Sequence, residues 1–286
     1  MLRRSERLSV STLALKKSRL APTPSGLLHE GNALNFILTW WYIRFHSGEL
    51  YLRIDDSDSS RVRDKYLENI FKVIEWLGID YDSGPMSIED HKKNFSQTHK
   101  TDYYFQELRS SMGNELFACV CSRKDLADSI GYPGTCLNLN LKHEPMLSAL
   151  RCKLECPGEF EKMILWRKDN APSYQLVSVL EDRDCGITDI IRGVDLLGSS
   201  NFQRDLFSYF SKVSFPKVFH HQLITDLDSS KLSKSQGSES VIEKFKTKED
   251  FLERVLWPLL DIEYEGITLE ELKVTPPEVS LFKEDS

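Results

Sequence analysis

Residues 19–33 of the chain combine a rigid turn with the start of an apolar helix, an arrangement that can bind phosphate. Pro22 and Pro24 fix φ and remove two backbone donors, so this segment cannot continue as a helix or a central strand. Gly26 then permits a sharp turn. Residues 33–45 are apolar on nearly every side, which predicts a buried helix. The unpaired N–H groups and positive dipole end of such a helix suit an anion such as phosphate.

Side chains around this helix start, and a second motif downstream, are suited to a nucleotide. His29 offers a side-chain donor, and Gly31 would let a base or ribose approach the backbone. Lys231 and Lys234 stand three residues apart in the segment Lys-Leu-Ser-Lys-Ser-Gln-Gly, where their ammonium groups could close over a polyphosphate. Each motif has a plainer interpretation, an ordinary Pro/Gly turn and a solvated basic loop. For the turn alone, the plainer interpretation is favoured.

The two motifs together, in this order, resemble the HIGH and KMSKS signatures of class I aminoacyl-tRNA synthetases. The amino-acid sequences of segments 19–33 and 52–58 resemble those of the glutamyl-tRNA synthetase group. The resemblance covers residues 18 to about 240. It implies a Rossmann-like α/β catalytic fold with a parallel sheet, and ATP with Mg²⁺ as substrate. By this resemblance the catalytic residues are His29, Lys231 and Lys234, and the ATP-binding residues are His29, Gly31, Asn32, Lys231 and Lys234.

The same resemblance implies a glutamate site. Its matching positions are Arg19, Ala21, Thr23, Asp55, Tyr174 and Arg192. An arginine suits a bidentate hold on a carboxylate, although a lone arginine is by default part of a surface salt bridge. The family has glutamate where this chain has Asp55, which shortens the side chain by about 1.5 Å. Either a water bridges the gap to the substrate ammonium, or the pocket takes a different amino acid. If the first holds, Asp55→Glu should tighten glutamate binding.

A cysteine-rich segment offers donors for a metal. Cys119 and Cys121 form a Cys-x-Cys pair, followed by Tyr132 and Cys136. Three thiolates and a phenol could complete a tetrahedral zinc site, whereas the alternative is two strand cysteines that bind no metal and a free Cys136. The glutamyl-Q tRNA(Asp) synthetases, short relatives in the group, carry a similar Cys-x-Cys and Tyr-x₃-Cys pattern, and the resemblance implies structural Zn²⁺. Nearby Cys152, Cys156 and His143 are interpreted as incidental.

The order of the predicted elements indicates the domain organisation. A strand, the helix of residues 33–45 and a second strand predict a βαβ crossover, whose ligands collect at the carboxyl ends of the strands. We expect the following five parts: a basic leader at 1–17, the first half of the nucleotide fold at 18–104, a zinc-bearing insertion at 105–170, the second half at 171–228, and the KMSKS-like loop with a short helical region at 229–286. The leader is interpreted as disordered or as an over-extended start, in preference to a targeting segment.

Composition limits the environment and the partners. The 286-residue chain carries a net charge of −7, and no apolar run reaches membrane-spanning length. We expect a cytoplasmic protein whose RNA binding depends on a local basic face. A monomer is our expectation, although the sequence does not determine the oligomeric state. Only about fifty residues follow the KMSKS-like loop, which is too few for an anticodon-binding region. The resemblance then implies glutamate transfer to the queuosine base of tRNA(Asp).

Three rival functions are compatible with parts of the sequence. An adenylating ligase could pass the amino acid to a protein, a small amine or another RNA. A nucleotidyltransferase of the same superfamily is disfavoured by the cysteine/tyrosine segment and the Arg-Ile-Asp-Asp strand. A catalytically silent paralogue is disfavoured because His29, Gly31, Lys231 and Lys234 are all intact.

Overall fold

The computed structural model describes residues 15–127, 129, 131–154, 162–224, 239–260, 268–277 and 283–284. Lys231, Lys234 and Cys156, which the sequence analysis singled out, lie outside these ranges. So do residues 1–14 of the predicted leader. Lys17 opens the first strand, and Lys16 Nζ lies 3.0 Å from an Asp189 carboxylate oxygen. The folded part of the chain thus includes two residues that the sequence assigned to the leader.

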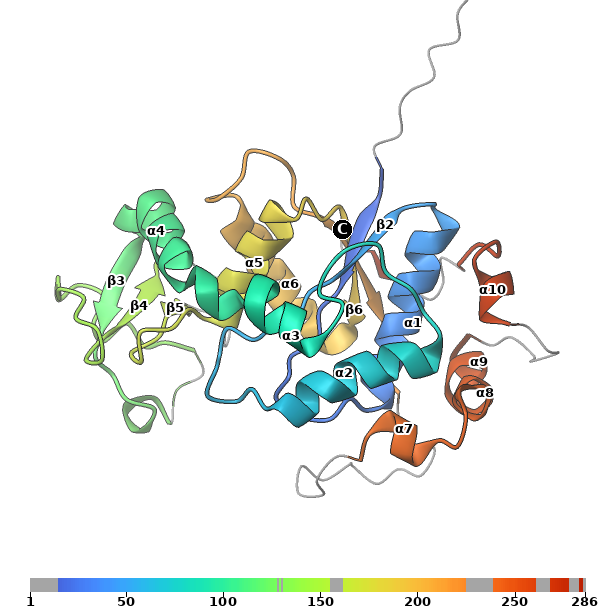
Figure 1. The fold of residues 1–286 in the computed structure, drawn as a ribbon. Coiled ribbons are helices and arrows are strands. Elements are labelled where there is room, and N and C mark those ends of the chain that lie inside the picture. The colour runs from blue at the N-terminus through green and yellow to red at the C-terminus, as the bar shows by residue number, and fades with distance from the viewer. Residues whose placement is uncertain are drawn as a thin grey trace, which may run out of the picture.

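The predicted βαβ crossover is present. Strand β1 (Lys17–Leu20) pairs in parallel with β2 (Glu49–Leu52), and helix α1 (Glu30–Phe45) connects them. Helix α2 (Asp64–Leu77) follows and ends at Gly78, whose φ of 69° is the left-handed conformation that glycine adopts readily. Figure 1 shows α1 and α2 packed beside these strands.

A second pair of parallel strands lies beside the first pair, β1 and β2. Strand β6 (Asp189–Gly193) pairs in parallel with β7 (Lys217–His221), and the short β8 (Lys283–Glu284) joins β7 antiparallel. The Thr188 amide donates to the Lys17 carbonyl at 2.9 Å, which fixes the start of β6 beside the start of β1. The carboxyl ends of β1, β2 and β6 therefore face one region, as the parallel arrangement requires.

The core around α1 explains its uniformly apolar sequence. Ile37, Leu38 and Trp40 point in different directions around α1 and are all fully buried, because strands cover one side and further helices cover the other. The predicted C-terminal helical region supplies part of that cover (Figure 1). Its helical segments are α7 (Val241–Lys244), α8 (Lys248–Phe251), a π-helical turn (Leu252–Leu256), α9 (Trp257–Leu260) and α10 (Leu269–Leu272).

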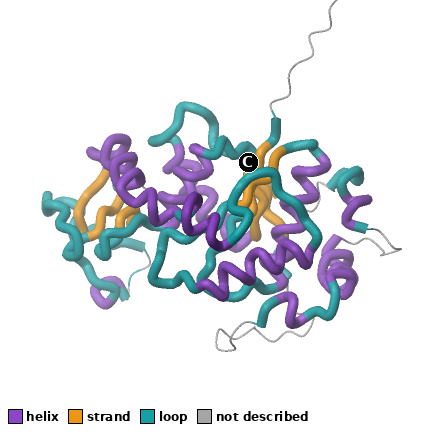
Figure 2. Tube along the Cα trace, in the orientation of Figure 1, coloured by secondary structure: helices purple, strands orange, loops and turns teal. Residues whose placement is uncertain are grey.

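The predicted insertion contains a small antiparallel sheet with its own core. Its strands are β3 (Leu116–Cys119), β4 (Ala149–Cys152) and β5 (Ile164–Trp166). Figure 2 shows this sheet well apart from the parallel strands, with helices between them. The helices that share its core are α4 (Thr101–Met112), α5 (Tyr174–Asp184) and α6 (Leu197–Phe207).

One predicted helix is shorter than expected. The sequence predicts a helix from residue 94 to 112, but α4 begins only at Thr101. Before it come α3 (Ile88–Asp90), a π-helical turn (His91–Phe95) and a 3₁₀ turn (Gln97–Lys100), with further 3₁₀ turns at Gly113–Glu115, Lys124–Leu126 and Val194–Leu196. No helix in the described part of the chain combines the length and apolar character needed to cross a membrane.

Candidate active site

Two cavities adjoin one another at the carboxyl ends of the parallel strands. The first, here called the helix cavity, has a volume of about 260 Å³ and is bounded by the start of α1 and the ends of β6 and β7. The second, here called the loop cavity, has a volume of about 350 Å³ and is bounded by the loops after β1 and β2. Tyr174, the first residue of α5 and 43% exposed, lines both.

The start of α1 presents an anion-binding end in the helix cavity. His29 is the N-cap; its Nδ1 accepts from the Gly31 amide at 3.1 Å, and the Asn32 side-chain oxygen accepts from the His29 amide at 3.0 Å. Because Nδ1 accepts, the neutral ring carries its proton on Nε2, which is therefore available as a donor. His29, Gly31 and Asn32 all line the cavity. This cap and the dipole of the helix suit a phosphate.

Arg192 adds an unusual cation to the same cavity. Its side chain is buried near the end of β6, and its Nη1 donates to Gln203 at 2.9 Å and to Ser200 at 3.4 Å. Nε and Nη2 have no partner within the described residues. Burial lowers the pKa of the guanidinium. A buried cation with two unsatisfied donors is costly unless a ligand completes it, and a carboxylate has the matching bidentate geometry.

Arg19 and Asp55 belong to one buried network. Asp182 Oδ1 accepts from Arg19 Nε at 2.9 Å and from Arg53 Nη1 at 2.6 Å. Arg53 Nε and Nη2 in turn donate to the two oxygens of Asp55 at 2.7 and 3.2 Å, and Gln97 donates to Asp55 at 2.8 Å. Burial raises the pKa of Asp55 despite Arg53. The Asp55 carboxylate is therefore held by the protein itself.

This network predicts a strong effect of Asp182→Asn. Burial acts to raise the pKa of Asp182, but Arg19 and Arg53 outweigh it and the pKa lies below its ordinary value. Losing the charge would leave the buried Arg19 without its carboxylate partner and Arg53 with Asp55 alone, so the free energy of unfolding should fall by about 3–5 kcal/mol at pH 7. Urea denaturation measures this loss.

The pH dependence of that loss follows from the direction of the shift. A carboxylate with a lowered folded-state pKa contributes stability that is present above the unfolded pKa and disappears as the pH falls through the folded pKa. The difference between wild type and Asp182→Asn should therefore shrink on acidification. Asp184→Asn, which removes a more exposed pair with Arg183, is the control and should cost at most about 1 kcal/mol. Equal losses for the two variants would contradict the network's importance.

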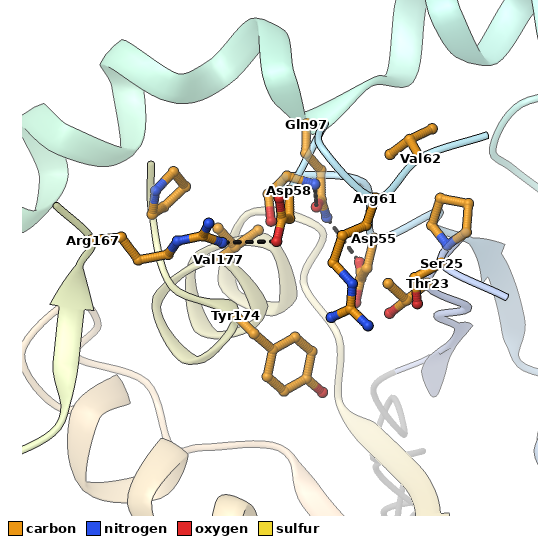
Figure 3. Close-up of a pocket in the computed structure, with 13 residues that line it drawn as sticks. Thr23, Ser25, Asp55, Asp58, Arg61, Val62, Gln97, Arg167, Tyr174 and Val177 are labelled. Carbon is orange, nitrogen blue, oxygen red and sulfur yellow. Dashed lines mark hydrogen bonds and ion pairs between the residues drawn. The ribbon is translucent and has the colours of Figure 1, made fainter. Parts of the chain in front are cut away.

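The loop cavity lies on the other side of Tyr174. Figure 3 shows Thr23 and Asp55 on one wall, with the Arg61 guanidinium between Asp55 and Tyr174 in this view. Arg167, from the end of β5, donates to Asp58 at 2.9 Å and so closes one edge. The cavity thus carries both hydroxyl and cationic groups beside the predicted substrate residues.

The predicted metal ligands converge at the end of β3. The Sγ atoms of Cys119, Cys121 and Cys136 lie within 4.8 Å of one another. Tyr132 Oη lies 3.4 Å from Cys119 Sγ and 3.9 Å from Cys121 Sγ. Burial acts to raise the pKa of Cys136, but hydrogen bonds from Tyr132 and the Val120 backbone outweigh it and lower the pKa to about 7. Three thiols and a phenol at this spacing fit the donor set of tetrahedral Zn²⁺.

The structure brings most of the predicted site residues together, although not into one pocket. Arg19, Ala21, Tyr174 and Arg192 line the helix cavity with the α1 cap, whereas Thr23, Asp55 and Tyr174 line the loop cavity. The sequence analysis missed several polar residues that shape the site, namely Arg53, Arg61, Gln97, Asp182, Asn35 and His221. Arg53 alone had a signal in the sequence, since it stands just before the acidic residues that follow β2. The others become visible only through contacts.

Comparisons with known proteins agree with this geometry. Residues 17–117 and 145–273 match the family model for tRNA synthetases class I (E and Q), catalytic domain. Cys119, Cys121, Tyr132 and Cys136 fall in the gap between the two matched ranges. A glutamate–tRNA synthetase structure from Elizabethkingia anophelis covers 91% of this chain with a TM-score of 0.73 at 18% identity, and the chain covers 65% of it. That likeness concerns the fold.

The sequence relatives include proteins named glutamyl-Q tRNA(Asp) synthetase and proteins named glutamate–tRNA ligase. The glutamyl-Q tRNA(Asp) synthetase of Synechococcus sp. (strain CC9605) is 34% identical over 226 residues, which are 77% of this chain and 74% of the relative. The glutamate–tRNA ligase of Buchnera aphidicola is 28% identical over 259 residues, 80% of this chain but 53% of the relative. The chain therefore spans about half the length of such ligases. Taken with the family match over most of the fold, these findings show that the chain belongs to the class I tRNA synthetases (E and Q).

Proposed function

We propose that this protein activates glutamate with ATP, forming glutamyl-adenylate, and transfers the glutamyl group to a tRNA. The observation that carries the proposal is Arg192, a buried guanidinium with two unsatisfied donors in a cavity that also holds the start of α1. A carboxylate on Arg192 and a phosphate at the helix start would share one cavity. Amino-acid activation needs this juxtaposition.

The chemistry requires alignment and charge neutralisation more than covalent participation by the protein. The α-carboxylate of glutamate attacks the α-phosphorus of ATP, a P–O bond breaks, and pyrophosphate leaves with the electron pair. His29 Nε2 and the α1 N-terminus are suited to hold the phosphates, and Gly31 and Asn32, which line the same cavity, would contact the nucleotide. Lys231 and Lys234 would close over the triphosphate, with Mg²⁺ arriving bound to ATP.

The glutamate site would consist of Arg19, Ala21, Thr23, Asp55, Tyr174 and Arg192. Arg192 is the best-suited carboxylate partner, because Arg19 already donates to Asp182. Asp55 is held by Arg53 and Gln97, so it can meet the substrate ammonium only with lone pairs that those donors leave unused. The shorter Asp55 side chain would thus act as part of a fixed acceptor surface.

The small sheet with its cysteines would be a zinc-bearing insertion. Cys119, Cys121, Tyr132 and Cys136 would fill all four positions of Zn²⁺, leaving none for water, so the metal would be structural. We propose the domain boundaries given by the sequence, except that the first half of the nucleotide fold, predicted at 18–104, begins with β1 at Lys17. The insertion at 105–170 separates it from the second half at 171–228, and the KMSKS-like loop with its helical region occupies 229–286.

The proposed acceptor is the queuosine base of tRNA(Asp). Three relatives that the chain covers over 73–78% of their length are named glutamyl-Q tRNA(Asp) synthetase, which favours this acceptor over the 3′ end of tRNA(Glu). Transfer of radiolabelled glutamate tests it. Queuosine-containing tRNA(Asp) should be labelled in an ATP-dependent manner, and the same tRNA lacking queuosine should not. Labelling of tRNA(Glu) alone would overturn this acceptor assignment while preserving the activation chemistry.

A further inference from the structure

Asn35 places an unsatisfied acceptor in the helix cavity. It lies on α1, six residues beyond the His29 cap, and lines the cavity together with His221 and Ile191. Its Nδ2 donates to the Ile191 carbonyl at 3.1 Å and contacts His221 Nε2 at 3.2 Å. Both amide hydrogens are thereby used. Within the described residues, Asn35 Oδ1 has no hydrogen-bond partner, and it is not among the fully buried unsatisfied atoms.

The orientation of this amide is fixed by its two partners. A flipped amide would set Oδ1 against the Ile191 carbonyl oxygen, which is repulsive, so the nitrogen must face Ile191. The buried His221 supports the same amide orientation. Its Nδ1 lies 2.8 Å from the Gln222 carbonyl and must donate to it. In the neutral ring Nε2 is then an acceptor, which requires the Asn35 amide to donate.

The neighbours of Asn35 are suited to a flat ligand group, and the Asp195 carboxylate also lines this cavity. His221 is followed along the chain by Leu223 and Ile224, and all three line the helix cavity. The anion-binding cap at His29 lies about 9 Å away along the helix axis, from the rise of 1.5 Å per residue. A nucleotide with its phosphates at the cap would therefore extend its base toward Asn35 and the apolar side chains of Leu223 and Ile224.

We propose that Asn35 Oδ1 accepts a hydrogen bond from the exocyclic amino group of adenine and makes the site select 6-aminopurine over 6-oxopurine nucleotides. The inference rests on the proposed function in one respect, namely that the helix cavity holds ATP. A 6-oxopurine presents a carbonyl oxygen where adenine presents N–H, so two acceptors would face each other. A site built to pair with a donor rejects an analogue that lacks it.

Calorimetric titration of the intact protein with ATP and with ITP tests this without requiring turnover. The wild type should bind ATP at least about ten-fold more tightly than ITP. ATP would gain a hydrogen bond between two uncharged groups at Asn35 Oδ1, whereas ITP would place a carbonyl oxygen against the same oxygen. Asn35→Ala and the size-matched Asn35→Leu should bring the ratio close to one. Asn201→Ala, on an exposed turn of α6, is the control and should keep the wild-type ratio. Thermal denaturation confirms that each variant is folded.

The outcomes separate this inference from the proposed function. Tight ATP binding with a wild-type ratio near one, a preference for ITP, or an unchanged ratio in both folded Asn35 variants would overturn the role of Asn35 and leave activation by ATP intact. Absence of ATP binding by the wild-type protein would overturn both.

Discussion

Arg192→Met should lower kcat/KM for glutamate in ATP–pyrophosphate exchange by about a thousand-fold, because loss of a buried charge partner costs roughly 2–5 kcal/mol. The effect should be concentrated in the KM for glutamate, since Arg192 lines the helix cavity and two of its donors have no partner in the described part of the chain. The KM for ATP should change little. Initial rates at varied glutamate and varied ATP separate the two parameters.

The same substitution should leave the fold nearly as stable as before. Methionine fills a similar volume without carrying a desolvated charge, which offsets the loss of the bonds to Gln203 and Ser200. Arg192→Lys keeps the positive charge but loses the planar pair of N–H donors that can bind both oxygens of a carboxylate, so this variant should retain only part of the activity. Arg63→Met, at an exposed arginine, is the matched control. A folded Arg192→Met protein with an unchanged KM for glutamate would contradict the assignment.

Removal of the proposed Zn²⁺ should produce the largest loss of stability. We expect one Zn²⁺ per chain in purified protein, and we expect Cys119→Ser or a strong chelator to remove it. Binding to such a site is coupled to folding and is worth about 10 kcal/mol or more in small zinc peptides, so the free energy of unfolding of the insertion should fall steeply. Metal analysis and thermal denaturation, followed by re-addition of Zn²⁺, measure both effects.

Cys185→Ser provides the control for this experiment, because Cys185 lies at the end of α5 outside the cluster. It should retain zinc and most of the stability. Wild-type protein that is folded and free of stoichiometric zinc would reject the site, and so would loss of zinc in Cys185→Ser but not in Cys119→Ser.

Local signals were sufficient to predict several elements of the fold. The buried, apolar helix α1 and the second strand that follows it, β2, were expected from the sequence and are confirmed. These elements begin and end where propensity, capping and burial agree. The helix predicted from residue 94 fails for a tertiary reason. Asp56 accepts from His91, Ser96 and the Gln97 amide, which holds that segment in π-helical and 3₁₀ turns.

Some residues of the candidate site could likewise be predicted from local sequence, and others could not. His29, Gly31, Asn32 and the three clustered cysteines were predicted because their types and spacing lie within short segments of sequence. Asn35 and His221 are 186 positions apart, and Arg53 and Asp182 are 129 positions apart. Nothing local in either segment indicates that these side chains meet. Their roles depend on strand order and register, which bring distant positions to one edge of the sheet.

The most direct test of the central claim is amino-acid-dependent ATP–pyrophosphate exchange across the twenty amino acids, first without and then with bulk tRNA. We expect exchange with glutamate alone and without tRNA, which would also show that the shorter Asp55 side chain is tolerated. Exchange driven only by another amino acid would mean that the pocket around Asp55 and Arg192 selects a different substrate. No exchange under either condition would contradict the account and favour a catalytically silent member of the family.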